Sequence, residues 1–158
     1  MAADDIFDED LVLVGLDAPS DEAVIRALGK RLFDAGWVKD SFVPAAVERE
    51  RTFPTGLPTQ PVGTAIPHTD SKHVNRTGIA VGVLARPVGF GNMGEPTATV
   101  EASLVFLVAV HEPERQVQTL SSLAQLLHNA ALLQELVRSK DAHAVVSILN
   151  REVSASPH

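Results

Sequence analysis

One histidine stands out by its position in the chain. The stretch "VGTAIPHTDSKHV", residues 62–74, alternates small and β-branched residues, stops at Pro67, and places His68 before a polar turn. Pro67 keeps the preceding Ile66 extended and stiffens the approach to the histidine. With a reference pKa of about 6.5, much of an imidazole is neutral in the cytoplasm and has a free lone pair. His68 is therefore a candidate nucleophile, against the simpler alternative of a solvated loop histidine.

Two other kinds of site have to be weighed against a nucleophile. One alternative is a metal site, since histidine and carboxylate side chains bind zinc or iron. Its candidate ligands are His68, Asp70, His73, His111, Glu112 and Glu114. They show no HExxH or similar fixed spacing, so we expect no metal. The stretch "GFGNMG", residues 89–94, fits the GxGxxG pattern, but residues typical of a strand follow it where a nucleotide loop needs a helix. We therefore interpret these glycines as a loop between strands that needs positive φ, and expect no cofactor.

Composition narrows the class of protein. The chain has 158 residues, 45% of them hydrophobic, no cysteine and a formal net charge of −7. An acidic chain with 4% aromatic residues lacks both the charge and the stacking surfaces that nucleic acid requires. The acidic start "MAADDIFDED" does not resemble a secretory signal, and no apolar run reaches the roughly 20 residues of a membrane helix. We expect a cytoplasmic protein with no direct membrane insertion.

The elements that must position His68 follow from the apolar periodicity. A strand is expected at 11–16, a helix from Ser20 or Asp21 to about Ala35, and a second helix that Asp40 caps and that ends near residues 49–56. Strands at 62–66, 78–84 and 97–110 and helices behind Pro113, from Asn129 to Val137 and at 141–150 follow, before a frayed end at 151–158. This order predicts an α/β (α+β) fold in which helices sandwich a mixed sheet. We expect a single domain over residues 1–158, with its core at about 6–150.

The segment around His68 resembles a known family. The stretch "VERERTFPTGLPTQPVGTAIPHTDSKHV" is similar to the active-site region of phosphotransferase-system enzyme IIA domains of the fructose/mannitol class. The threonine after the histidine and "FPTGLPT" are most similar to the galactitol-type branch. The stretches "GEPTATVEASLVFLVAV" and "QVQTLSSLAQLL" resemble the family's later turn, strand and helix, so the similarity covers residues 6–150.

The resemblance implies a function. Such domains accept a phosphoryl group from phospho-HPr on a histidine, here His68, and pass it to an enzyme IIB component for uptake of a sugar or polyol. Arg49, which with Glu50 matches the family's helix-ending pair, would stabilise the phosphoryl group, because a guanidinium fork suits its oxygens. Thr69 and Ser71 could donate further hydrogen bonds. The alternative is a nitrogen-type regulatory module that binds partners according to its phosphorylation state.

The sequence departs from the family at one place. The family's second histidine, near the phosphorylated one, corresponds to Glu114, and His111 stands three residues earlier. A carboxylate there would repel a phosphohistidine or raise the pKa of His68. Glu114 also fits a first-turn charge on the following helix. We therefore predict that His111 is the helper.

Overall fold

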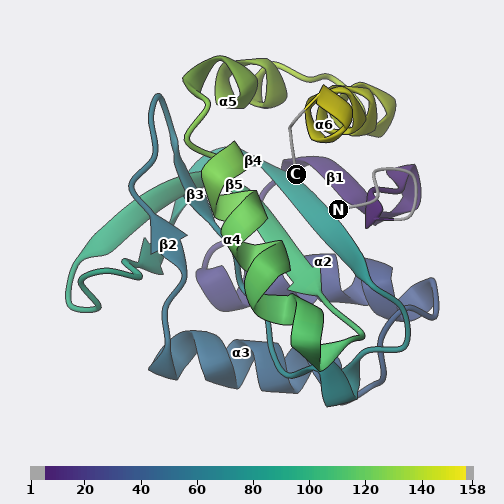
Figure 1. Cartoon of the computed structure of the whole chain (residues 1–158). Helices are drawn as coiled ribbons and strands as arrows, with labels where there is room; N and C mark the ends of the chain where they lie inside the picture. The colour runs from purple at the N-terminus through teal and green to yellow at the C-terminus, as the bar shows by residue number, and fades with distance from the viewer. Residues whose placement is uncertain (1–5, 156–158) are drawn as a thin grey trace.

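A five-stranded mixed sheet forms the centre of the molecule (Figure 1). The computed structural model describes residues 6–155. The strands are β1 (Val12–Leu16), β2 (Gly56–Leu57), β3 (Gly63–Ala65), β4 (Gly78–Gly91) and β5 (Thr99–Ala109), arranged in the order β1-β4-β5-β3-β2. The pairs β1–β4 and β3–β5 are parallel, whereas β4–β5 and β2–β3 are antiparallel. Because β3 and β5 run in the same direction, their carboxyl ends lie at the same edge of the sheet.

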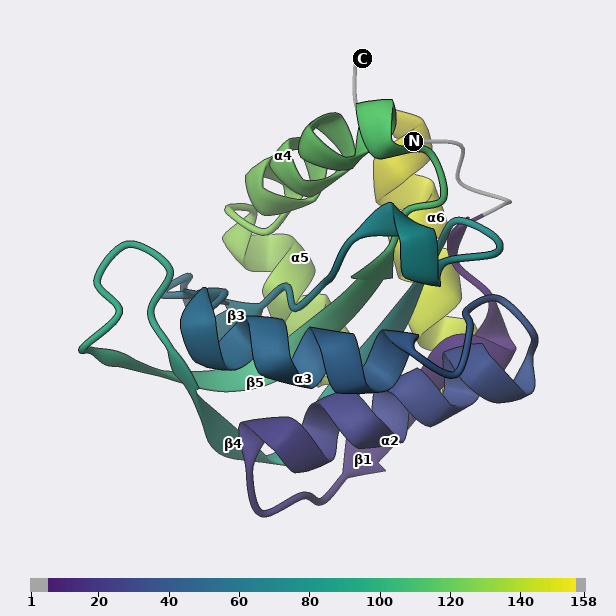
Figure 2. The same cartoon turned by 90° about the horizontal axis from the view of Figure 1, so that it is seen from below.

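Helices cover both faces of this sheet (Figure 2). The helices are α2 (Asp21–Asp34) and α3 (Phe42–Thr52) on one face and α4 (Gln116–Leu126), α5 (Ala130–Val137) and α6 (Ala142–Ala155) on the other. Ala80 and Val81 are consecutive in β4, yet Ala80 belongs to the hydrophobic cluster with α2 and α3, and Val81 to the cluster with α4, α5 and α6. Successive strand residues point to opposite faces, so β4 is buried on both. The predicted sandwich of helices around a mixed sheet is confirmed.

The predicted helix starts are partly confirmed. Ser20 Oγ accepts from the Ala23 N–H at 3.1 Å, and Asn129 Oδ1 accepts from the Leu132 N–H at 3.1 Å, as N-cap residues do. The prediction that Asp40 caps α3 is wrong. Ser41 occupies the N-cap position without capping the helix, because its hydroxyl lies 2.8 Å from Nδ1 of His73 instead.

The glycine-rich stretch after β4 also corrects an expectation. Strand β4 continues well past the predicted end at residue 84, so Gly89 and Gly91 lie in the strand and neither has a positive φ. A Cβ atom on Gly91 would lie 2.6 Å from Cβ of Pro54. Glycine is therefore needed at position 91 because Pro54, in the segment that follows α3, packs closely against the strand there. The element after this stretch is the strand β5, as predicted.

The observed ends of other strands and helices differ from the predicted ends by a few residues. The first strand begins at Val12 because Glu9–Leu11 form a short 3₁₀ helix. Helix α6 continues to Ala155, so the predicted fraying from residue 151 is wrong as far as the structure describes the chain. The first five residues lie outside the described part. Within residues 6–155, the helices are too short or too polar to cross a membrane.

Candidate functional site

His68 lies at the edge where β3 and β5 end. It pairs with Val108 as an isolated parallel bridge, and the Val108 N–H donates to the Pro67 carbonyl at 2.9 Å. The pairing of β3 with β5 therefore resumes just beyond Ala65 and carries the histidine to the sheet edge. His111 follows the end of β5 by two residues, so the two histidines come from neighbouring strands that end at the same edge.

The ring of His68 is held in one tautomer. Its Nδ1 lies 2.9 Å from the Ile66 carbonyl oxygen. Because a carbonyl only accepts, Nδ1 carries the proton and the lone pair is left on Nε2. Among the described residues Nε2 has no hydrogen-bond partner, and it is not sealed from solvent even though the residue is only 7% exposed. This arrangement presents a single nucleophilic nitrogen.

The surroundings of His68 favour the neutral ring. Burial lowers the pKa of His68 below its ordinary value of 6.5, and the positive charge of Arg49 lowers this pKa further. The hydrogen bond to Ile66 and the charge of Asp70 oppose this shift without reversing it. His68 is therefore neutral near pH 7, which is the form that a nucleophile needs.

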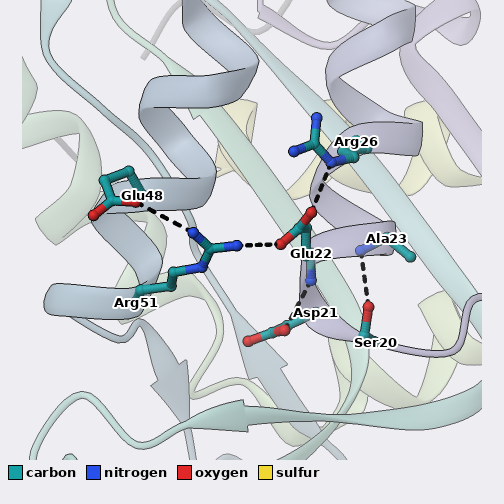
Figure 3. Close-up of polar contacts among 7 residues, drawn as sticks. All are labelled: Ser20, Asp21, Glu22, Ala23, Arg26, Glu48 and Arg51. Carbon is teal, nitrogen blue, oxygen red and sulfur yellow. Dashed lines mark hydrogen bonds and ion pairs between the residues drawn. The ribbon is translucent and has the colours of Figure 1, made fainter.

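Arg49 and Arg51 are two residues apart on α3 but have different surroundings. Arg51 donates to Glu22 of α2 at 2.6 Å and to Glu48 at 3.3 Å, within a surface cluster of charges (Figure 3). The Arg49 side chain has no hydrogen bond or ion pair with any residue in the described part of the chain, and its Nε is buried. Its guanidinium carbon lies 5.1 Å from the centre of the Phe53 ring. Arg49 is thus the arginine whose fork is free to bind an anion.

The turn after His68 is fixed from α4. Gln116, the first residue of α4, donates through Nε2 to the Thr69 carbonyl at 3.0 Å, and its Oε1 accepts from the Ser71 hydroxyl at 3.3 Å. Thr69 and Ser71 are both buried. Gln116 was not predicted from the sequence. Two features of the sequence could have indicated it: Gln116 lies at the start of the helix behind Pro113, and its amide can both donate and accept hydrogen bonds.

The two candidate helpers, His111 and Glu114, are both exposed but lie in different local structures. His111 is exposed; its Nδ1 lies 3.0 Å from the Val74 carbonyl oxygen, and its N–H donates to the Thr77 hydroxyl at 2.9 Å. Glu114 is exposed in the 3₁₀ helix Pro113–Arg115, immediately before α4. Neither side chain forms a hydrogen bond with His68.

The possible metal ligands do not converge. Nδ1 of His73 lies 2.8 Å from the Ser41 hydroxyl, and the Glu112 carboxylate accepts from Thr77 at 3.1 Å. Between residues 6 and 155, no three histidine or carboxylate side chains are grouped to hold a metal ion.

Comparison with known proteins identifies the family. Residues 5–152 match the family described as phosphoenolpyruvate-dependent sugar phosphotransferase system, EIIA 2. The chain belongs to this family. It is an enzyme IIA phosphotransfer domain of the fructose/mannitol class, as the motif around His68 predicted.

Relatives of this IIA domain occur in several kinds of protein. The transcriptional regulator ManR of Bacillus subtilis is 30% identical over 142 residues, which are 89% of this chain and 20% of ManR. The mannitol-specific EIICBA component of Pasteurella multocida is 31% identical over 147 residues, 91% of this chain and 22% of that protein. The chain thus spans about a fifth of the length of these two curated relatives.

A solved structure agrees with the fold of the IIA domain. The mannitol enzyme IIA of Escherichia coli, in complex with phosphorylated enzyme IIB, superposes with a TM-score of 0.75 at 25% identity, over 90% of this chain and 96% of that chain. Two of these relatives are named as mannitol components, and the galactitol-type assignment stays a prediction.

Proposed function

We propose that this IIA domain accepts a phosphoryl group from phospho-HPr on Nε2 of His68 and passes it to an enzyme IIB component during uptake of a sugar or polyol. The observation that carries the proposal is the neutral, carbonyl-bound ring of His68, whose one lone pair is on Nε2. In the transfer, the Nε2 lone pair forms the new N–P bond while the donor's P–N bond breaks, and the donor imidazole keeps the electron pair. The second transfer, to IIB, repeats this exchange with His68 as the leaving group.

The neighbours of His68 supply charge and position. The transferring group is anionic and loosely bonded, so catalysis depends on placing it and on stabilising its charge. Arg49 has a free guanidinium for the phosphoryl oxygens, and its Nε is a buried donor without a partner among residues 6–155. The Ile66 carbonyl faces Nδ1–H and stabilises the positive charge that the ring gains when Nε2 is phosphorylated. Thr69 adds a hydroxyl next to the acceptor.

The partners follow from the relatives. The E. coli mannitol IIA was solved with phosphorylated IIB, and a second relative, 32% identical over 108 residues, is named multiphosphoryl transfer protein 1. By analogy, HPr is the donor and IIB the acceptor for this domain, in the cytoplasm. Nucleic acid and direct membrane insertion have no part in this proposal.

A regulatory role is the second candidate. The similarity to ManR, a transcriptional regulator, favours it, because the same fold there belongs to a protein that controls transcription. In this case phosphorylation of His68 would alter binding to a partner instead of feeding IIB. Transfer of the label from the phosphorylated domain to an added IIB supports the transport role, whereas a stable phosphodomain that never passes its label supports regulation.

The deciding experiment is phosphorylation in vitro. We expect incubation with phosphoenolpyruvate, enzyme I and HPr to add one acid-labile phosphoryl group, and His68→Ala to abolish it. His128→Ala, which changes an exposed histidine between α4 and α5, serves as the control and should label normally. Full labelling of the His68→Ala variant would refute the assignment.

A further inference from the structure

The second residue of the Arg49–Glu50 pair is a buried acid. Glu50 is 6% exposed, and both of its carboxylate oxygens bind Thr55. The Thr55 N–H donates to Oε2 at 2.7 Å, and the Thr55 hydroxyl donates to Oε1 at 2.8 Å. In the described part of the chain Glu50 has no ion pair, although Arg49 is its neighbour. A carboxyl group is rarely buried without a cation, so its role calls for an explanation.

The hydrogen bonds continue from Thr55 to the active histidine. The Thr55 carbonyl accepts from the Ile66 N–H at 3.3 Å, and the Ile66 carbonyl is the group that holds Nδ1 of His68 at 2.9 Å. The residue after Thr55 begins β2, whose Gly56 pairs with Ala65 of β3. Glu50 therefore holds Thr55 in place, and the Thr55 carbonyl in turn holds Ile66, two residues before His68.

We propose that Glu50 is a positioning residue for phosphoryl transfer. Through Thr55 and Ile66 it fixes the carbonyl that keeps the proton of His68 on Nδ1 and the lone pair on Nε2. This inference rests on the proposed function, and it adds a role for a residue that touches neither the phosphoryl group nor the reacting nitrogen.

The protonation state of Glu50 decides which substitution can preserve its hydrogen bonds to Thr55. Burial raises the pKa of Glu50 to about 7, and the charge of Asp21 acts in the same direction; the two Thr55 donors and the charge of Arg49 oppose this. A protonated Glu50 still accepts from the Thr55 N–H, and its own O–H can donate to the Thr55 hydroxyl, which also accepts. A glutamine can make the same two bonds. The hydrogen bonds to Thr55, rather than the negative charge, are therefore the feature to test.

Three variants separate these contributions. Glu50→Ala removes both bonds to Thr55, Glu50→Gln keeps both, and Thr55→Val keeps the N–H bond only. The matched control is Glu48→Ala on the same helix, where the side chain is exposed and its carboxylate binds only Arg51 among the described residues. For each variant we would measure the initial rate of labelling from phospho-HPr and the tautomer of His68 from its ring nitrogen chemical shifts.

We expect Glu50→Ala to slow labelling about tenfold or more, since small misplacements of a reacting group cost rates of this size, and to raise the fraction of His68 with its proton on Nε2. Glu50→Gln and Glu48→Ala should stay within about threefold of the unmodified protein, with Thr55→Val between the extremes. A normal tautomer in Glu50→Ala, or in Thr55→Val if Glu50→Ala does not fold, overturns the proposal. So does a Glu50→Gln variant as slow as Glu50→Ala. The tautomer is read without phosphoryl transfer, so it tests Glu50 even if the unmodified domain proves unable to accept phosphate.

Discussion

Two histidines at one edge of the sheet make the same hydrogen bond in different surroundings. His68 and His111 each direct Nδ1 to a main-chain carbonyl, at 2.9 Å and 3.0 Å. His68 uses a carbonyl two residues back in its own segment and is buried, whereas His111 is exposed and reaches Val74, 37 residues away. A carbonyl bond selects the tautomer, but burial shifts the pKa. The first region therefore holds a neutral ring with its lone pair on Nε2, which suits the nucleophile that we propose, whereas the second joins the end of β5 to the segment before β4.

We expect the largest effect from Arg49, whose charge we propose to act on the phosphoryl group at His68. We expect Arg49→Ala to slow phosphorylation of His68 at least about tenfold, because hydrogen bonds to charged groups contribute about 1.5–3 kcal/mol each. Thermal stability should stay nearly intact, since the Arg49 side chain has no hydrogen bond or ion pair among the described residues to lose, only a contact with the exposed ring of Phe53. Labelling rates and melting temperatures check both statements.

The control for Arg49 is Arg51→Ala, which breaks the contacts to Glu22 and Glu48 (Figure 3). That variant should label at the normal rate. An equal loss of rate in the two variants, or a large fall in melting temperature for Arg49→Ala alone, would mean that the free guanidinium is not the catalytic one.

A smaller effect tests whether His111 helps His68. If His111 is the helper, its protonated Nε2 donates to a phosphoryl oxygen on His68. His111→Ala then removes one hydrogen bond of about 1 kcal/mol and slows labelling about fivefold. Glu114→Gln is the comparison variant, and we expect it to label normally because the Glu114 carboxylate is exposed at the start of α4. Faster labelling by Glu114→Gln would instead show that this carboxylate repels the phosphoryl group and holds the place of the second histidine.

The smallest effect concerns pH. Because burial lowers the pKa of His68, its ring should titrate below 6.5 in the folded chain, as followed by nuclear magnetic resonance. Between that lowered pKa and 6.5 the unfolded chain binds more protons than the folded one, so His68 contributes less to stability as the pH falls through this window. The denatured chain in urea provides the reference titration. A folded midpoint at or above 6.5 would remove the distinction between a buried nucleophile and an ordinary surface histidine.

The sequence by itself determined the local features of this protein. A strand that ends just before Pro67 and His68 follows from alternation and from the restraint that proline imposes. The helix caps at Ser20 and Asn129 depend on short-range hydrogen bonds. The order of the other strands and helices follows from the same local periods, whereas the two-residue strand β2 (Gly56–Leu57) was not predicted, because it is defined by its pairing with β3. One local prediction failed because a residue far along the chain takes part. Asp40 was expected to cap α3, but the helix starts later and the Ser41 hydroxyl binds His73, 32 residues away.

Only the tertiary structure shows which polar side chains near His68 already have a partner and which do not. Arg49 and Arg51 look alike in the run "VERERT", and what separates them is Glu22 of α2, which binds Arg51 from 29 residues away. Gln116 reaches Thr69 across 47 residues. A period of two or of 3.6 residues specifies a face of an element but does not specify the partner that the face meets. Those partners are fixed when α2, α3 and α4 pack against the sheet, because packing sets which donors are satisfied and which remain free for a ligand.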